Sequence, residues 1–144
     1  LISCKEDEPS IREFRFDMNS SGIISEGVAT RAISPTETLF EVHNLPRSTN
    51  PSEMISFGDI RFNGERSTYS CNDISVSLNN IDSISHKAYS YKAVSGNLVM
   101  ESPANGIIEG NFNFDFVCPD DSQKDTIHIS NGHFRISYST LWIQ

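Results

Sequence analysis

The stretch that decides the fold lies at residues 106–138, where one pattern occurs twice. The two copies are IIEGNFNFDF at residues 107–116 and ISNGHFRISY at residues 129–138. In each copy a glycine is followed at the second, fourth and sixth positions by a large apolar residue, which is the period of a strand with one face in a core. The polar run between them, residues 118–125, contains a proline and suits a surface loop. We therefore predict two long antiparallel strands joined by this loop.

The glycines of the two copies allow two geometries. Asn131-Gly132 is a strong turn signal and would form a hairpin of its own. Gly110 holds the corresponding place in the first copy but follows Glu109, and its strand already ends in turn-like sequence on both sides. If the two copies share one geometry, each glycine is a bulge inside a strand of about twelve residues. We predict a bulge at both glycines.

Alternating apolar residues recur through the rest of the chain in short segments separated by polar turns. The clearest of these segments are residues 13–18, 39–43, 54–62, 74–78, 88–94 and 98–101. Within 54–62 the apolar positions shift by one residue at Gly58, so a bulge is expected there. Residues 30–38 are mostly polar and contain Pro35, and residues 79–86 fit either a loop or a turn of helix. We expect the apolar residues 141–143 to pack on the edge of the domain or to close its core.

About nine such segments, without a convincing amphipathic helix, indicate an all-β protein. The predicted architecture is an antiparallel β-sandwich or a closed barrel of about eight to nine strands, ending in a long bulged hairpin. A chain of 144 residues fits one domain. We assign residues 11–144 to this single all-β domain.

Charge and motifs exclude several classes of function. The net charge is −8, from 19 acidic and 11 basic residues, without a cluster of Lys and Arg that would attract a phosphate backbone, so we expect no nucleic acid partner. The sequence has no nucleophile elbow, phosphate loop or dinucleotide fingerprint, and its four histidines lack metal-ligand spacing. We expect no catalytic residues, no metal and no cofactor. A carboxylate pair such as Glu109 and Asp115 would do acid–base work only if the fold brought the two together.

The first residues, Leu1-Ile2-Ser3-Cys4, resemble the lipobox of bacterial lipoproteins, in which Cys4 would carry acyl chains. Lys, Glu, Asp and Pro follow at residues 5–9 and suit a flexible acidic tether, so residues 1–10 form lipobox and tether. The tether is similar to the export signal of surface lipoproteins in the Bacteroidetes group. The resemblance implies a membrane anchor on Cys4 and an outer-membrane lipoprotein facing the cell surface, with the periplasmic face as the alternative.

A second resemblance lies near the end of the chain, in residues 95–99, 107–114 and 127–136. A Ser-Gly strand, an Ile-x-Gly-x-Phe strand and an Asn-Gly-x-Phe strand in this order resemble the C-terminal half of small uncharacterised lipoproteins of Bacteroides and its relatives. The shared motifs are structural. They imply a common fold and bring neither catalytic residues nor an activity.

Two groups of side chains remain as candidates. If Cys4 is acylated, Cys71 and Cys118 form an even pair that either makes a disulfide or serves as small buried hydrophobic residues. The tyrosines Tyr69, Tyr89 and Tyr91 are the candidate ligand-binding surface, since an exposed Tyr offers a large face and a polar tip. The alternative is that these tyrosines pack against one another's strands within the sheet.

Two functions from different classes follow from these observations. The first is a membrane-anchored, surface-exposed lipoprotein that acts as a non-enzymatic binding or assembly module of the cell envelope, with a glycan or an envelope protein as its partner. The alternative is a small-ligand carrier or hydrolase with its site inside a β-barrel.

Overall fold

The computed structural model describes residues 10–45, 52–81 and 85–142, which form strands and connecting turns. The predicted lipidation site, Cys4, lies outside the described residues. The strands are β1 (Arg12–Met18), β2 (Ser21–Ile33), β3 (Thr38–Leu45), β4 (Ser52–Arg61), β5 (Ser67–Ser70), β6 (Ser75–Ile81), β7 (Ala88–Met100), β8 (Ile107–Val117) and β9 (Ile127–Trp142). The described chain contains no helix of the length and apolarity needed to cross a membrane. The predicted all-β class is confirmed.

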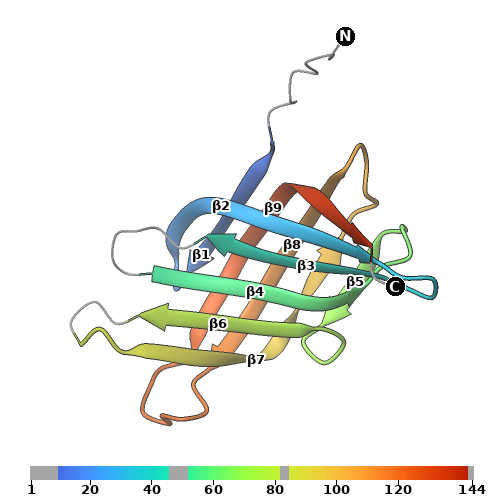
Figure 1. Cartoon of the computed structure of the whole chain (residues 1–144). Coiled ribbons are helices and arrows are strands. Elements are labelled where there is room, and N and C mark those ends of the chain that lie inside the picture. The colour runs from blue at the N-terminus through green and yellow to red at the C-terminus, as the bar shows by residue number, and fades with distance from the viewer. Residues whose placement is uncertain (1–9, 46–51, 82–84, 143–144) are drawn as a thin grey trace.

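All nine strands belong to one sheet, in the order β5-β7-β6-β4-β3-β2-β1-β9-β8. A further pairing between β7 and β8 joins the two ends of this order, so the hydrogen bonds run round a ring (Figure 1). Strand β5 is bonded to the end of β7 and stands beside the ring. Neighbouring strands are antiparallel, except that the ends of β2 and β9 run parallel. The protein is therefore a single uneven barrel, which decides between the two predicted architectures.

Strand β9 closes this ring. One of its edges pairs with β8, which confirms the long hairpin predicted for the repeated pattern. Its other edge pairs first with β1 and then, from Tyr138 onward, with β2. A single strand thus holds together the beginning and the end of the sheet.

The two glycines of the repeated pattern have different backbones. In β9, Phe112 of the partner strand faces Gly132 while Phe114 faces Ile129, so β9 carries an extra residue and the predicted bulge is confirmed. In β8, Gly110 is paired regularly with Phe134, and the bulge predicted there is wrong. A Cβ atom at Gly110 would lie 2.5 Å from the Phe134 ring. The glycine of β8 therefore makes room for that ring and does not bend the strand.

The shift of apolar parity at Gly58 also has its structural counterpart. Phe40 faces Ile60 and Val42 faces Phe57, so β4 carries one residue more than β3 over this stretch. The left-handed backbone of Asp59, with φ at 56°, accommodates the extra residue. Because of this bulge both Phe57 and Ile60 point inward, as predicted.

Aromatic side chains fill the interior of the barrel. Phe57 contacts Phe112, with ring centroids 5.0 Å apart, and Phe14 stacks on Phe134 at 5.8 Å. The largest fully buried side chains are Phe14, Phe16, Phe40, Phe57, Phe114, Phe116, Phe134, Ile55, Ile60, Leu78, Leu98 and Met100. The pockets of the described structure therefore lie at one end of the barrel and on its outer wall.

The last apolar residues do not enter this core. Leu141 and Trp142 have 55% and 77% of their surface exposed, so the expectation that they pack against the domain is wrong for these two, and residue 143 lies outside the described residues. Their backbone is nevertheless held, because Leu141 pairs with Ala32 and Trp142 with Ile33. Beyond Tyr138 the strand extends past the packed interior, and its side chains meet solvent.

Candidate binding site

One end of the barrel, the mouth near the C-terminal end of β2, has an arginine that faces inward. Ala29 and Arg31 alternate on one side of β2, and Ala29 is buried. Arg31 is paired directly with Phe40, which is 2% exposed. Residues directly opposite each other in an antiparallel pair point to the same face. The Arg31 side chain therefore lies on the interior side, at the end of the core.

The Arg31 guanidinium lies beside two aromatic rings that contact each other. Its Cζ atom is 6.0 Å from the centroid of Phe40 and 5.7 Å from that of Tyr138. Its Nη1 donates a hydrogen bond of 3.3 Å to the Tyr138 hydroxyl. Its Nε is buried and has no acceptor among the described residues. A buried donor without a partner costs about 1–3 kcal/mol, so Arg31 is held in this position at a cost to stability.

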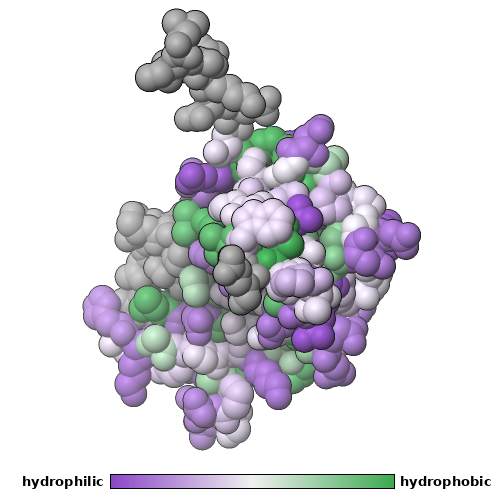
Figure 2. Space-filling model, turned by 45° about the vertical axis from the view of Figure 1, so that its right-hand side comes forward, coloured by the Kyte–Doolittle hydropathy of each residue, from purple (hydrophilic) through white to green (hydrophobic). Residues whose placement is uncertain are grey.

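A pocket of about 400 Å³ opens beside this guanidinium. The side chains that line it include polar groups and apolar or aromatic walls, namely Arg31, Thr38, Phe40, Phe62, Asn63, Gly64, Pro103 and Tyr138. Figure 2 turns this end of the barrel toward the viewer and shows hydrophobic residues gathered near the middle of the face between hydrophilic ones. A concave site with a few polar groups at the mouth of a barrel is a common form of ligand site.

The neighbouring cations at this end are already paired. Arg61 lies 3.6 Å from Glu37, and Arg66 lies 2.9 Å from Glu101. No carboxylate of the described residues lies within 4.0 Å of Arg31. Arg31 is thus distinguished from the other arginines of the mouth by its position inside the barrel and by its lack of a counter-ion there.

The opposite end of the barrel holds a different buried polar group. Asn44, 1% exposed, donates to the backbone oxygen of Glu53 at 2.9 Å and accepts from the backbone N–H of Ile55 at 2.6 Å. The side chains of Glu53 and Asn80 come from paired positions on β4 and β6. Glu53 Oε1 and Asn80 Oδ1 are both buried and without a hydrogen-bond partner among the described residues. Burial raises the pKa of Glu53 above its ordinary value.

The structure separates the tyrosines predicted to bind a ligand. Tyr91 is only 6% exposed, so the expectation that it is exposed is wrong. It alternates inward on β7, and burial raises its pKa. Tyr89 is half-buried, with Lys124 Nζ 4.1 Å from its ring centroid. Tyr69 donates a 2.6 Å hydrogen bond to the backbone oxygen of Arg61. All three pack with the core, and their role in binding stays a prediction.

The two cysteines are both free in the structure. Cys118 is buried in the core, as the alternative of a small hydrophobic residue describes, and Cys71 is half-buried after β5. No disulfide joins them in this structure, and the bridge stays a prediction.

Two histidine–carboxylate pairs lie on the outer wall, between β8 and β9. His133 Nε2 is 2.9 Å from Glu109 Oε1, and His128 Nδ1 is 2.6 Å from Asp115 Oδ1. The hydrogen bond from His128 lowers the pKa of Asp115. Glu109 and Asp115 are six residues apart on one strand, about 20 Å at the usual rise, so the fold does not bring this carboxylate pair together. Among the described residues no group of three or more His, Cys, Asp or Glu is placed to hold a metal.

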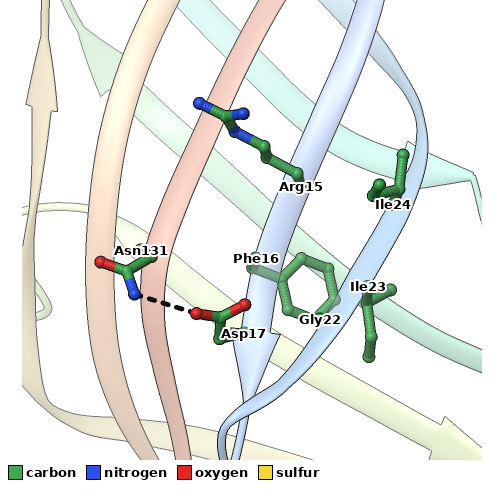
Figure 3. Close-up of a pocket in the computed structure, with 7 residues that line it drawn as sticks. All are labelled: Arg15, Phe16, Asp17, Gly22, Ile23, Ile24 and Asn131. Carbon is green, nitrogen blue, oxygen red and sulfur yellow. Dashed lines mark hydrogen bonds between the residues drawn. The ribbon is translucent and has the colours of Figure 1, made fainter.

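A shallow hollow of about 310 Å³ lies on the outer wall over β1 and β2. Figure 3 shows Asp17 of β1 and Asn131 of β9 pointing toward each other, and the Asn131 amide donates to Asp17 at 2.9 Å. Arg15 extends from β1 above Asp17 in the view of Figure 3, and Ile24 of β2 is exposed. Because the Asp17 carboxylate and the Asn131 amide are hydrogen-bonded to each other, this hollow is a weaker candidate for a binding site than the pocket at the mouth.

The chain matches no family model, no curated protein and no solved structure. The choice of a candidate binding site therefore rests on the geometry of the described residues. We take the mouth pocket around Arg31 and Tyr138 as the candidate binding site.

The sequence interpretation missed both of these residues. It took residues 30–38 as mostly polar, whereas β2 continues to Ile33. The available signal was the alternation of Gly27, Ala29, Arg31 and Ile33, which places small or apolar residues and one arginine on the same side of a strand. An arginine in such a position is a candidate for a functional group, because burial without a counter-ion is costly.

Proposed function

We propose that this protein is a non-enzymatic binding module of the bacterial cell envelope, anchored through a lipid on Cys4 and facing the cell surface. The observation that supports binding is the pocket at the mouth of the barrel, where the unpaired Arg31 guanidinium lies beside an open space of about 400 Å³. The lipobox and the acidic tether support the anchor.

The groups at the mouth suit recognition better than chemistry. Arginine stays protonated at every physiological pH, so Arg31 cannot serve as a general base. The Tyr138 and Thr38 hydroxyls and the Asn63 amide are neutral hydrogen-bonding groups. The paired histidines His128 and His133 belong to the outer wall, where each is bonded to a carboxylate. These features favour a site that holds its ligand unchanged.

A small-ligand carrier is the second candidate, and the same pocket favours it. A hydrolase or carrier with a site deep inside the barrel has less support, because Phe57, Phe112 and Phe134 occupy the interior. A carrier would therefore hold a free small molecule at the mouth, whereas an envelope module would hold the end group of a larger molecule there. The size of the ligand distinguishes the two.

The anchor is tested in cells that express the full precursor. A clickable palmitate analogue should label the protein, and a Cys4→Ser variant should lose the label and leave the membrane fraction. Protease added to intact cells should cleave the wild-type chain if it faces outward. A chain that is unlabelled, or that stays on the membrane without Cys4, would contradict the lipid anchor.

Binding is tested with the purified Cys4→Ser chain and a panel of neutral and acidic glycans. We expect saturable binding of at least one glycan, without a change in the glycan after long incubation. Chemical turnover of a bound glycan would overturn the non-enzymatic assignment. Binding of no panel member, combined with binding of a free metabolite, would favour the carrier.

A further inference from the structure

We propose that the mouth pocket binds an acidic sugar residue, whose carboxylate accepts hydrogen bonds from the Arg31 guanidinium. This inference rests on the proposed function as a binding module and names the chemical class of its ligand. Three features of the pocket carry it: an unpaired cation, a free hydroxyl proton, and a small polar lining.

The cation selects an anion. The guanidinium fork matches a carboxylate with parallel N–H donors, and hydrogen bonds between charged groups are about twice as strong as neutral ones. In the described structure Arg31 makes its one hydrogen bond to Tyr138 and leaves Nε without an acceptor. A ligand carboxylate in the pocket would supply the missing countercharge.

The Tyr138 hydroxyl is prepared to assist. Its oxygen accepts the hydrogen bond from Arg31 Nη1 at 3.3 Å, so its own proton is free to be donated. The Tyr138 ring is fixed by an edge-to-face contact with Phe40, with centroids 5.3 Å apart. A rigid donor next to the guanidinium would hold a carboxylate or an adjacent hydroxyl in one orientation.

The lining favours a sugar over a purely apolar acid. The rings of Phe40 and Phe62 are 2% and 6% exposed, so little of their surface is offered to a ligand. Thr38, Asn63 and backbone groups of the turn at Gly64 supply donors and acceptors for several hydroxyls. A volume of about 400 Å³ lies at the small end of the ~300–1,000 Å³ usual for ligand pockets, which suits one or two sugar residues.

The net charge of −8 does not prevent this selectivity. At physiological ionic strength the Debye length is about 8 Å, so carboxylates elsewhere on the surface are largely screened from a ligand in the pocket. The carboxylates of the rim, Glu37 and Glu101, are each paired with an arginine. Glu65 on the neighbouring turn is exposed to solvent. The nearest unscreened charge for a bound ligand is therefore Arg31.

The test compares matched ligands on the purified Cys4→Ser chain. The ligands are D-glucuronate and D-galacturonate with their short oligomers, the neutral sugars glucose and galactose with theirs, and acetate as a carboxylate without a ring. The single tryptophan, Trp142, pairs with Ile33 near the mouth and serves as a fluorescent reporter, with calorimetry as the second readout. We expect a uronate to bind at least about tenfold more tightly than its neutral counterpart and than acetate.

Variants locate the site. Arg31→Gln should weaken uronate binding at least about tenfold, and Tyr138→Phe about threefold, since it removes the free hydroxyl proton. Arg31→Lys keeps the charge but loses the fork, and should bind with intermediate affinity. Arg61→Gln is the matched control, because it removes the same charge from an exposed side chain of the same end. Its affinity should stay within about twofold of the wild type.

Each other outcome contradicts a defined part of the inference. Equal binding of neutral and acidic sugars, lost in Arg31→Gln, would leave the binding module intact and overturn the acidic ligand. Equal losses in Arg31→Gln and Arg61→Gln would show attraction by bulk charge and no pocket site. Binding of no glycan would overturn the acidic-sugar ligand and would leave an envelope protein as the partner of the binding module. If circular dichroism shows that Arg31→Gln does not fold, Tyr138→Phe and Arg31→Lys decide the matter.

Discussion

Each end of the barrel holds an inward-facing polar side chain with a buried atom that has no hydrogen-bond partner among the described residues. The two side chains differ in whether they can lose their charge. At the mouth, Arg31 keeps its charge beside two aromatic rings and an open pocket. At the opposite end, Glu53 is 6% exposed beside Asn80, and burial raises its pKa. An acid can become neutral by taking up a proton, whereas arginine cannot lose one. Glu53 can therefore lose its charge by protonation, whereas Arg31 keeps its charge.

The largest effect on stability should come from Asn44, whose amide bonds two backbone groups at the end of the barrel opposite the mouth. Asn44→Ala leaves the backbone oxygen of Glu53 and the N–H of Ile55 without their buried partner. We expect the free energy of unfolding to fall by about 2–3 kcal/mol. Urea denaturation measures it, with Asn63→Ala in the exposed turn as control, where the loss should stay under about 1 kcal/mol. Equal losses of unfolding free energy in the two variants would mean that the end opposite the mouth does not depend on Asn44 in particular.

A smaller effect, of opposite sign, is expected from Glu53→Gln. The raised pKa means that the ionised carboxylate destabilises the folded state above that pKa, and that the penalty fades as pH falls toward the ordinary value of 4.5. Glutamine is neutral and adds a donor for Asn80 Oδ1. At pH 8 the variant should be more stable by about 1 kcal/mol, with the difference shrinking on acidification.

Thermal melts of wild type and variant between pH 4.5 and 8 measure this difference. Glu41→Gln, an exposed position on β3, is the control and should show no such trend. A destabilised Glu53→Gln protein at pH 8 would mean that the ionised carboxylate has a partner that stabilises it.

At the mouth, a substitution of Arg31 should abolish ligand binding while changing stability little. Arg31→Met keeps an apolar stem of similar length and removes both the buried Nε and the contacts with Phe40 and Tyr138. The cost of the unpaired donor and the cation–π attraction are of similar size, so stability should change by less than about 1 kcal/mol. Uronate binding should nevertheless be lost. A loss of stability above 2 kcal/mol would instead make Arg31 a structural residue.

The smallest effect on stability is expected for the His128–Asp115 pair, which lies on the outer wall away from both ends of the barrel. The depressed pKa of Asp115 contributes stability above its ordinary value of 3.8, and this contribution is lost as pH falls through the depressed value. Both side chains of the pair are largely exposed, at 64% for His128 and 43% for Asp115, so His128→Gln should cost less than about 0.5 kcal/mol. NMR titration should show the pKa of Asp115 rising toward 3.8.

Periodicity predicted most of the strands, because a half-buried strand must alternate. The parity shift at Gly58 predicted the bulge in β4 for the same reason. The repeated glycine pattern marked the limit of this approach, since Gly110 and Gly132 hold the same place in the two copies but have different backbones. Both glycines lie against a ring of the partner strand, and what separates them is the register of β8 against β9. Register is a property of two strands, and a single pattern does not contain it.

The candidate site was harder to predict than the fold. Whether Arg31 faces the interior depends on β2 continuing past Thr30 and on the pairing of Arg31 with Phe40. Tyr91 lies opposite Leu78 and inside, and its polar neighbours Ser90 and Lys92 point to the other face, as alternation along a strand requires. A polar residue inside a barrel breaks the pattern that identifies the inside. For Arg31 the alternation along β2 was the available signal, and its pairing with Phe40 places it on the inner side.

The closure of the ring by β9 has a consequence for how the chain folds. Ile11 is hydrogen-bonded to Ser137, 126 residues further along, and β1 obtains its second neighbour only from the last strand. Hairpins such as β1–β2 and β8–β9 form from local contacts, whereas closing the ring requires the two ends of the chain to meet. Folding rates fall as such distant contacts increase. We expect ring closure to be the slow step, and until it occurs β1 and β9 expose bare edges that are open to pairing with other chains.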